Sequence, residues 1–265
     1  MKSTSASRRI LVVSDGSRLP RGSELSAVLA GQAHRLEDLG FDTSTAQLRA
    51  GDLVASAHTL GAVRGDVSAF YLVHTEADQA WRVRQALEHT GHVVVTDDDL
   101  RAVVAAAHLL TELHRRKWAI DRSAVVVADS DELPAIGALL TAIGIRNMVF
   151  WRQADAPAVP LEQVTQDAAV LLDLRAAPAP HPRAEGHDGP LVIRLPALAD
   201  ALPVLPGLLI ALSERAGRPQ TVLAATAHLL ATTAVPGMPL AAPGTALTDE
   251  IAWAARQTLS HPPGL

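Results

Sequence analysis

The chain has no cysteine, a single tyrosine and only two lysines among its 265 residues. Without cysteine it can form neither a disulfide nor a thiolate metal site, so nothing points to an oxidising compartment and a cytoplasmic protein is expected. Proton transfer by lysine or tyrosine is restricted to Lys2, Lys117 and Tyr71. Uninterrupted apolar runs of about 18 or more residues are also missing, which excludes an ordinary membrane span.

The charge is mildly negative, with 28 acidic against 23 basic residues, and no basic block extends beyond Arg115–Lys117. Nucleic-acid binding is therefore disfavoured. The first apolar run, Ile10–Val13, is too short for a signal peptide and predicts a strand instead.

Short β-branched runs alternate with longer helical patterns, which is typical of a doubly wound α/β fold with parallel sheets. In the first part the predicted strands are Arg9–Ser14, Thr43–Leu48, Val67–Val73 and His92–Thr96, with helices at Gly22–Leu39 and Ala77–Thr90. A long amphipathic helix, Asp98–Arg116, is expected to link two domains.

The second part repeats the alternation and ends in helices. Its predicted strands are Ser123–Ala128, Asn147–Trp151, Ala168–Leu172 and Leu191–Leu195, with helices at Leu133–Ile143, Pro206–Ala216, Pro219–Thr232 and Thr248–Leu259. The Pro-, Ala- and His-rich segment Ala176–Gly189 predicts a surface connection.

Three motifs, in this order, resemble the malic enzyme family. Val12–Ser17 reads Val-Val-Ser-Asp-Gly-Ser and is similar to the turn before the family's catalytic-lysine helix. Val94–Asp99, followed by an Ala/Val-rich helix, is similar to the family's His-Asp-Asp-Gln-His-Gly-Thr segment. Leu205–Leu208 is similar to its Phe-Pro-Gly-Ile element.

The resemblance implies an N-terminally truncated family member with two domains. Residues 1–97 would form the malic-enzyme-like α/β domain, and residues 98–265 a Rossmann-like, doubly wound domain of the NAD(P)-binding type with C-terminal helices. It also implies a homodimer.

The turn where the dinucleotide fingerprint should lie departs from the family. A pyrophosphate needs glycines that let the backbone approach it at a helix N-terminus. Here Ala128, Asp129 and Ser130 are followed by two more acids, so we expect no bound NAD(P). Arg152, after the next strand, is interpreted either as a partner for a 2′-phosphate or as a solvated arginine.

The residues for malate oxidation are also altered. Gln32 occupies the position of the catalytic lysine and cannot act as a base, while the tyrosine segment would precede Val12 and is missing. The family's metal carboxylates at a strand end are replaced by Leu72-Val73-His74. A divalent metal is expected only by family analogy.

The degenerate catalytic positions are therefore Asp15, Gln32, Asp97 and Asp98. The aspartates at 97–99 are interpreted as a helix cap and as partners of the helix dipole. Alternatively, Asp97 and Asp98 could form a weak metal site with His74, in which His74 and Asp98 are the candidate ligands.

Two classes of function follow from these departures. In the first, the protein is a non-catalytic binding or regulatory relative of malic enzymes, with a small-molecule ligand or a protein as its partner. In the second, it is an oxidoreductase or lyase with altered chemistry, or one subunit of a split enzyme. The acidic turn predicts that any adenine ligand carries little phosphate, as in adenosine.

Overall fold

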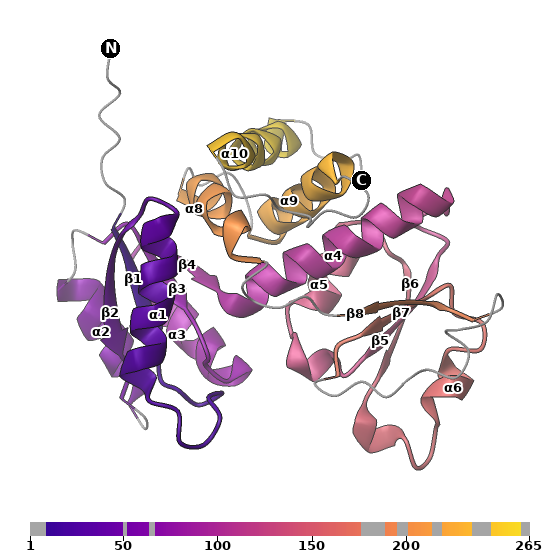
Figure 1. The fold of residues 1–265 in the computed structure, drawn as a ribbon, viewed down its shortest axis with the longest axis horizontal. Coiled ribbons are helices and arrows are strands. Elements are labelled where there is room, and N and C mark those ends of the chain that lie inside the picture. The colour runs from indigo at the N-terminus through magenta and orange to yellow at the C-terminus, as the bar shows by residue number, and fades with distance from the viewer. Residues whose placement is uncertain are drawn as a thin grey trace. The chain divides into compact units, whose positions relative to one another are not determined.

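The chain divides into two compact units, Met1–Asp97 and Asp98–Leu265, each built on its own parallel sheet (Figure 1). The computed structural model describes residues 9–49, 52–63, 67–175, 189–194, 201–213, 219–234 and 245–260. The predicted α/β fold with two parallel-sheet units is confirmed.

The first unit holds four parallel strands in the order β2-β1-β3-β4. They are β1 Arg9–Ser14, β2 Asp42–Gln47, β3 Ala69–Leu72 and β4 Val93–Thr96, and the helices are α1 Leu25–Asp38, α2 Leu53–Val63 and α3 Ala77–His89. Val12 aligns with Thr45 on one side and Tyr71 on the other, which places these three side chains on the same face of the sheet.

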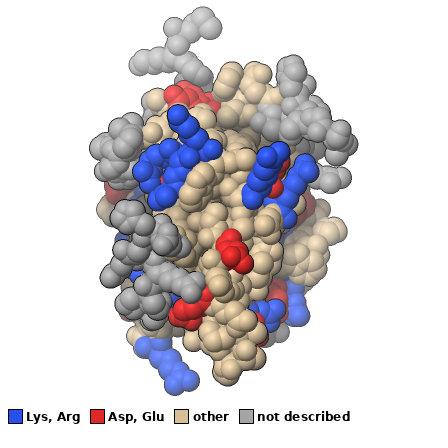
Figure 2. All heavy atoms as spheres, turned by 90° about the vertical axis from the view of Figure 1, so that its right-hand side faces the viewer, with Lys and Arg blue, Asp and Glu red and all other residues tan. Residues whose placement is uncertain are grey.

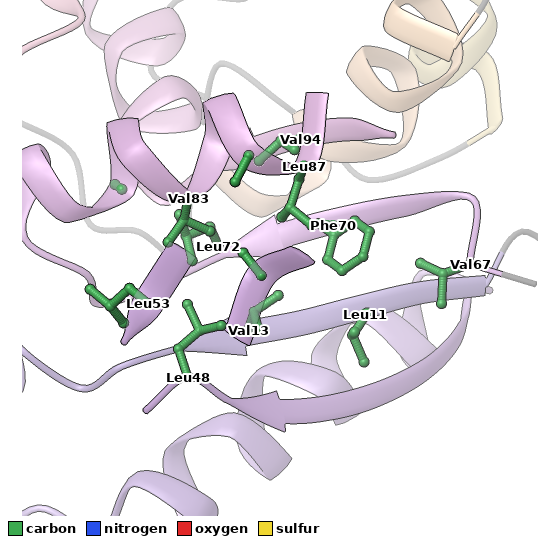
Figure 3. Packing of buried hydrophobic residues seen from close by; sticks show 13 residues of the cluster. Leu11, Val13, Leu48, Leu53, Val67, Phe70, Leu72, Val83, Leu87 and Val94 are labelled. Carbon is green, nitrogen blue, oxygen red and sulfur yellow. The ribbon is translucent and has the colours of Figure 1, made fainter. Parts of the chain in front are cut away.

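A compact apolar cluster fills the opposite face of this sheet (Figure 3). Leu11 of β1 and Phe70 of β3 lie in it beside Val83 and Leu87 of α3. The buried residues of α1, including Leu29, do not belong to this cluster, so α1 covers the other face. The central strands β1 and β3 therefore have both faces buried, as is typical of a parallel sheet, whereas Thr45 and Gln47 of the edge strand β2 are exposed.

The second unit repeats the strand order, as β6-β5-β7-β8. Its strands are β5 Ala124–Ala128, β6 Asn147–Trp151, β7 Val170–Asp173 and β8 Leu191–Arg194, and its helices are α4 Asp97–Arg116, α5 Ile136–Ala142, α6 Leu161–Val164, α8 Leu205–Ser213, α9 Pro219–Thr233 and α10 Thr245–Ser260. The predicted strands all form, with ends shifted by two residues or fewer. Most of the predicted connection at Ala176–Gly189 lies outside the described residues.

Several helices differ from the sequence prediction. α6 was not predicted, and α1 and α10 begin at Leu25 and Thr245 instead of Gly22 and Thr248. α2 was not predicted, because its apolar residues surround the helix and Gly61 interrupts them, so that no amphipathic period appears. α5 begins at Ile136 instead of Leu133, because Ser130–Glu132 forms a separate 3₁₀ turn. Among the described residues, no helix is both long and apolar enough to cross a bilayer.

Candidate functional site

The strand order locates one candidate site in each unit. In both sheets the first strand is central, with the second strand on one side and the third on the other. Ligands of open parallel sheets bind outside the carboxyl ends of the strands where the order reverses. The candidate sites are therefore the loops after β1 and β3 in the first unit, and those after β5 and β7 in the second.

Asp15, directly after β1, shapes its own turn. Its Oδ1 accepts hydrogen bonds from the amide of Ser17 at 3.0 Å and from the Ser17 hydroxyl at 2.7 Å. Gly16 has φ +74°, a conformation that glycine adopts without strain, and its amide donates to the hydroxyl of Ser14. The carboxylate proposed from the sequence as a catalytic group thus serves as an acceptor for the local backbone.

The loops after β1 and β3 and the start of α4 are joined by hydrogen bonds, here named the carboxyl-edge network. The amide of His74 donates to Asp97 Oδ2 at 3.0 Å. The His74 carbonyl accepts from the Arg18 amide at 3.1 Å, and the Glu76 amide donates to the Ser17 hydroxyl at 2.8 Å. His74 has φ +49°, a left-handed conformation that costs a non-glycine residue free energy. Asp97 therefore holds a strained loop in place.

The aspartates at positions 97–99 are all buried at the first turn of α4. Carboxylates are stabilised there by the partial positive charge of the helix N-terminus. Asp98 lies 3.9 Å from the guanidinium of Arg101, one turn further along the helix. In the described part of the chain, no group of three or more His, Asp or Glu side chains is placed to hold a metal ion.

Gln32 lies apart from the carboxyl-edge network. α1 begins against the turn after β1, because a Cβ added at Gly16 would lie 3.3 Å from Leu25 Cδ2. Gln32 is two helical turns further on, about 10 Å along the axis. Its side chain is 7 % exposed, and its Oε1 has no hydrogen-bond partner among the described residues. Gln32 is thus a core residue on the sheet face covered by α1.

The turn after β5 contains the degenerate positions where the resemblance would place the dinucleotide fingerprint. Ala128 is the buried last residue of the strand, and Asp129 follows with φ +55°. The Asp129 amide donates to the carbonyl of Trp151 at 2.8 Å, and its Oδ1 accepts from the amide of Gln153 at 2.6 Å. The carboxylate thus binds the backbone amide of Gln153, two residues after the end of β6.

The chain after this turn does not enter a helix directly. Ser130 begins a 3₁₀ turn, and its carbonyl accepts from the amide of Leu133 at 3.0 Å. α5 starts only at Ile136 and is seven residues long. Arg152, exposed at the end of β6, lies 3.6 Å from Asp131 of the 3₁₀ turn. The arginine considered for a 2′-phosphate therefore has an acidic neighbour.

One ion pair at this edge was missed by sequence analysis. Asp173, the last residue of β7, is 2 % exposed and aligns with Ala128. Arg175 donates to both of its oxygens, from Nε at 2.7 Å and from the terminal nitrogen at 2.9 Å. These bonds raise the pKa of Arg175; burial opposes the shift, and the charges of Asp173 and Asp129 add to it. The available signal was an acid at the end of a buried strand, two residues before an arginine.

The fold defines a class of two-unit α/β proteins in which a Rossmann-like second unit is followed by helices. Among solved structures, the fold is that of malic enzymes. A putative malic enzyme (malate oxidoreductase) matches with a TM-score of 0.75 and 17 % identity, over 96 % of this chain and 85 % of its own.

The fold is also similar to those of malic enzymes from two named organisms. The enzyme of Pyrococcus horikoshii has a TM-score of 0.75 at 16 % identity, over 97 % of this chain and 77 % of its own. The NAD-dependent malic enzyme of Thermotoga maritima has a TM-score of 0.72 at 18 % identity, over 94 % of this chain and 84 % of its own. No protein-family model and no curated protein matches the sequence. The likeness at these identities is one of fold.

Proposed function

We propose that this protein is a non-catalytic relative of malic enzymes, which uses the fold to bind a small molecule or a protein partner. One observation carries the proposal. At the carboxyl edge of the second sheet, the chain's own carboxylates take the positions that a phosphate-bearing cofactor needs. Asp129 binds the Gln153 amide, and Asp173 binds Arg175.

The electrostatic cost of a pyrophosphate at this turn is large. Two like unit charges 4 Å apart repel by about 4 kcal/mol at an effective dielectric constant near 20. The turn carries Asp129, Asp131 and Glu132, and α5 is too short and too distant from the strand to offset them. Binding of NAD or NADP at micromolar affinity, about −8 kcal/mol, would have to overcome several such terms.

The first unit supports the same proposal. Malate oxidation requires a positioned base, and Gln32 has no titratable group in the relevant range. Asp97 uses one carboxylate oxygen to hold the His74 amide, which opposes its use as a metal ligand. The carboxyl-edge network therefore accounts for the retained Asp15 and Asp97 without a catalytic role.

The decisive experiment titrates the purified chain with NAD and NADP and follows malate-dependent nicotinamide reduction in the presence of Mg²⁺ or Mn²⁺. We expect neither binding in the micromolar range nor reduction. Tight dinucleotide binding or malate-dependent reduction by the unmodified chain would overturn the proposal.

A matched variant tests whether the carboxylates of this turn are what prevents dinucleotide binding. Asp129→Gly, combined with Asp131→Asn and Glu132→Gln, removes the three charges, and glycine accepts the φ of +55° at position 129. We expect affinity for NAD to rise at least about tenfold. Asp155→Asn changes an acid outside the turn and serves as the control, with affinity unchanged. Equal affinities for all three proteins would show that the carboxylates are not what excludes the cofactor.

The same turn favours ligands without phosphate. In a thermal-shift comparison of adenosine, ADP and NAD, we therefore expect only adenosine to raise the melting temperature of the protein. Small dicarboxylates belong in the same screen as candidates for the first unit. A melting temperature that rises further with each added phosphate would contradict the prediction that this turn disfavours phosphate.

A further inference from the structure

The outer edge of the second sheet is formed by a strand that is exposed where its neighbours are buried. β6 is exposed or half-buried at residues 147–150, whereas β5 beside it is buried at residues 125–128. In the described part of the chain, no strand pairs with β6 on the side away from β5. Two of its apolar side chains face water, with Val149 45 % and Phe150 48 % exposed. β6 is therefore an apolar edge strand, which proteins usually cover or interrupt.

The backbone of β6 directs hydrogen-bonding groups to this outer side. The carbonyl of Trp151 accepts from the amide of Asp129 at 2.8 Å, so the backbone groups of Trp151 point toward β5. In a strand, the N–H and C=O of one residue point to the same side, and those of the next residue to the other. Met148 and Phe150 therefore direct their N–H and C=O groups outward. These are the groups with which an added strand forms a ladder.

Both faces of this edge offer apolar contacts. The ring of Phe150 lies against α5, because a Cβ added at Gly137 would be 3.1 Å from the Phe150 Cζ. Val149 points to the opposite face, where Trp151 packs in a cluster with Leu161 of α6. An added strand would therefore have apolar neighbours on each face, which favours β-branched residues at its centre.

The charges at the two ends of β6 differ in sign. Arg146, directly before the strand, is exposed. Beyond the other end, Asp131 and Arg152 form an exposed ion pair at 3.6 Å, and Asp155 adds a second exposed acid. The edge is therefore basic at its start and acidic beyond its end. A segment with an acid at one end and a base at the other is complementary to it.

We propose that the outer edge of β6 binds an extended segment of another protein, which joins the four described strands of the second sheet as a further strand. The segment has β-branched residues at its centre, an acid beside Arg146 and a base beside Asp155. Main-chain hydrogen bonds to Met148 and Phe150 supply the affinity, and the end charges set the direction. This inference names a partner for the binding function proposed above and rests on it. Peptide binding and NAD titration are separate measurements, so that either can fail alone.

A synthetic peptide, Glu-Val-Thr-Ile-Thr-Val-Lys, serves as the probe. It carries a fluorophore and is titrated with the full chain, and its fluorescence anisotropy reports binding. We expect a dissociation constant of about 10–500 µM, since a short added strand makes few contacts. The same peptide with its central amides N-methylated keeps its side chains but cannot form the ladder, so its affinity should fall at least about tenfold. Equal affinities of the two peptides, or no binding of the first up to about 1 mM, overturn the proposal.

Substitutions in the protein separate this edge from other exposed apolar residues. Met148→Pro removes an outward N–H at an edge position where proline is tolerated, and should weaken peptide binding at least about tenfold. Val149→Lys removes an apolar contact and should weaken it about fivefold or more. Val54→Lys, at a valine of the first unit that is 41 % exposed, is the matched control and should leave the affinity within about twofold. Circular dichroism establishes that each variant is folded.

Charge exchange tests the complementarity of the ends. Arg146→Glu should weaken binding of the probe about fivefold or more, and a peptide with lysine in place of its glutamate should bind this variant within about twofold of the original pair. An exchanged pair that stays weak overturns the proposal. Sedimentation velocity of the full chain examines the other occupant of the edge. Self-association that Met148→Pro abolishes would show that a second copy binds there, and would overturn the proposal as well.

Discussion

At the scale of single residues, three aspartates near strand ends hold the loops at the carboxyl edges of the two sheets. Asp97 accepts from the His74 amide, Asp129 from the Gln153 amide, and Asp173 from both donor groups of Arg175. Hydrogen bonds in which one partner is charged are shorter and stronger than neutral ones. Each carboxylate therefore completes its own loop, and an external ligand must compete with a bond that is already made.

Removal of the Asp97 carboxylate should destabilise the first unit. Asp97→Ala leaves the His74 amide without its acceptor while His74 still has φ +49°, so we expect a loss of about 1.5–3 kcal/mol. Asp97→Asn keeps an acceptor oxygen and should lose less than half of that. Urea unfolding followed by circular dichroism measures both values. Equal losses in the two variants would indicate that the hydrogen bond is not the cause.

Stability should fall as the pH drops through the titration of His228 on α9. Burial, and to a smaller extent the charge of His114, lower the pKa of His228 below its ordinary value. The unfolded chain then binds more protons than the folded one between this lowered value and about 6.5. The free energy of unfolding therefore decreases as pH falls from about 6.5 and levels off below the folded-state pKa.

His228→Gln should reduce the dependence of the free energy of unfolding on pH in this mildly acidic range. The variant removes the group that must be kept neutral in the folded chain, so its melting temperature should change less between neutral and mildly acidic pH. His34→Gln, at an exposed histidine beside Glu37, is the matched control and should retain the wild-type slope. An unchanged slope in His228→Gln would contradict the assignment.

At the scale of secondary-structure elements, close helix contacts are set by small residues. A Cβ added at Gly207 of α8 would lie 2.5 Å from the Cβ of Ile251 on α10, a distance that packed side chains do not adopt. Gly31, inside α1, has no atom within 4 Å of the same position. Gly207 is therefore required for the close packing of α8 against α10, whereas Gly31 could be replaced by a larger residue without a steric clash.

Alanine at these positions should change stability in opposite directions. Gly207→Ala forces α8 and α10 apart and should cost about 1–3 kcal/mol, as overpacking of a core does. Gly31→Ala removes backbone freedom from a helix interior and should add about 0.5–1 kcal/mol. Chemical denaturation measures both. Destabilisation by Gly31→Ala would show that the open space beside α1 is occupied in solution.

Strands were easier to predict than helices in this chain. Strands such as β5, with its run of Val125–Val127, are buried on both faces and read as continuous apolar segments. α2 was missed, because exposed apolar residues such as Val54 and Ala62 obscure the inward-facing stripe of Leu53, Ala57 and Leu60 in the sequence. The late start of α5 could not be predicted either, because Asp129 bonds to Trp151 at the end of β6 and to Gln153 beyond it, both distant in sequence.

At the scale of the whole molecule, the chain consists of two units with the same strand order. Each has a parallel sheet and buried apolar residues of its own, including the clusters around Phe70 in the first unit and Leu171 in the second. On the described part of the surface shown in Figure 2, basic and acidic side chains lie in small groups among uncharged residues, and some acidic side chains lie directly beside basic ones. Neither unit depends on a disulfide, because the chain has no cysteine.

Separate cores predict separate unfolding. Scanning calorimetry should show two transitions, because domains with their own cores unfold as independent cooperative units. Asp97→Ala should lower only the transition of the first unit, and Gly207→Ala only that of the second. A single transition that both substitutions lower would indicate that the chain unfolds as one body.

The sequence by itself determined the α/β class and the strands, since strand burial and residue type are local properties. Only the tertiary structure decided how the aspartates are used, because a carboxylate becomes a loop anchor through a donor elsewhere in the chain. Asp97 meets the His74 amide across 23 positions and Asp129 the Gln153 amide across 24, which no local pattern encodes. The Asp173–Arg175 pair is close in sequence, yet its burial depends on the neighbouring strands β5 and β8.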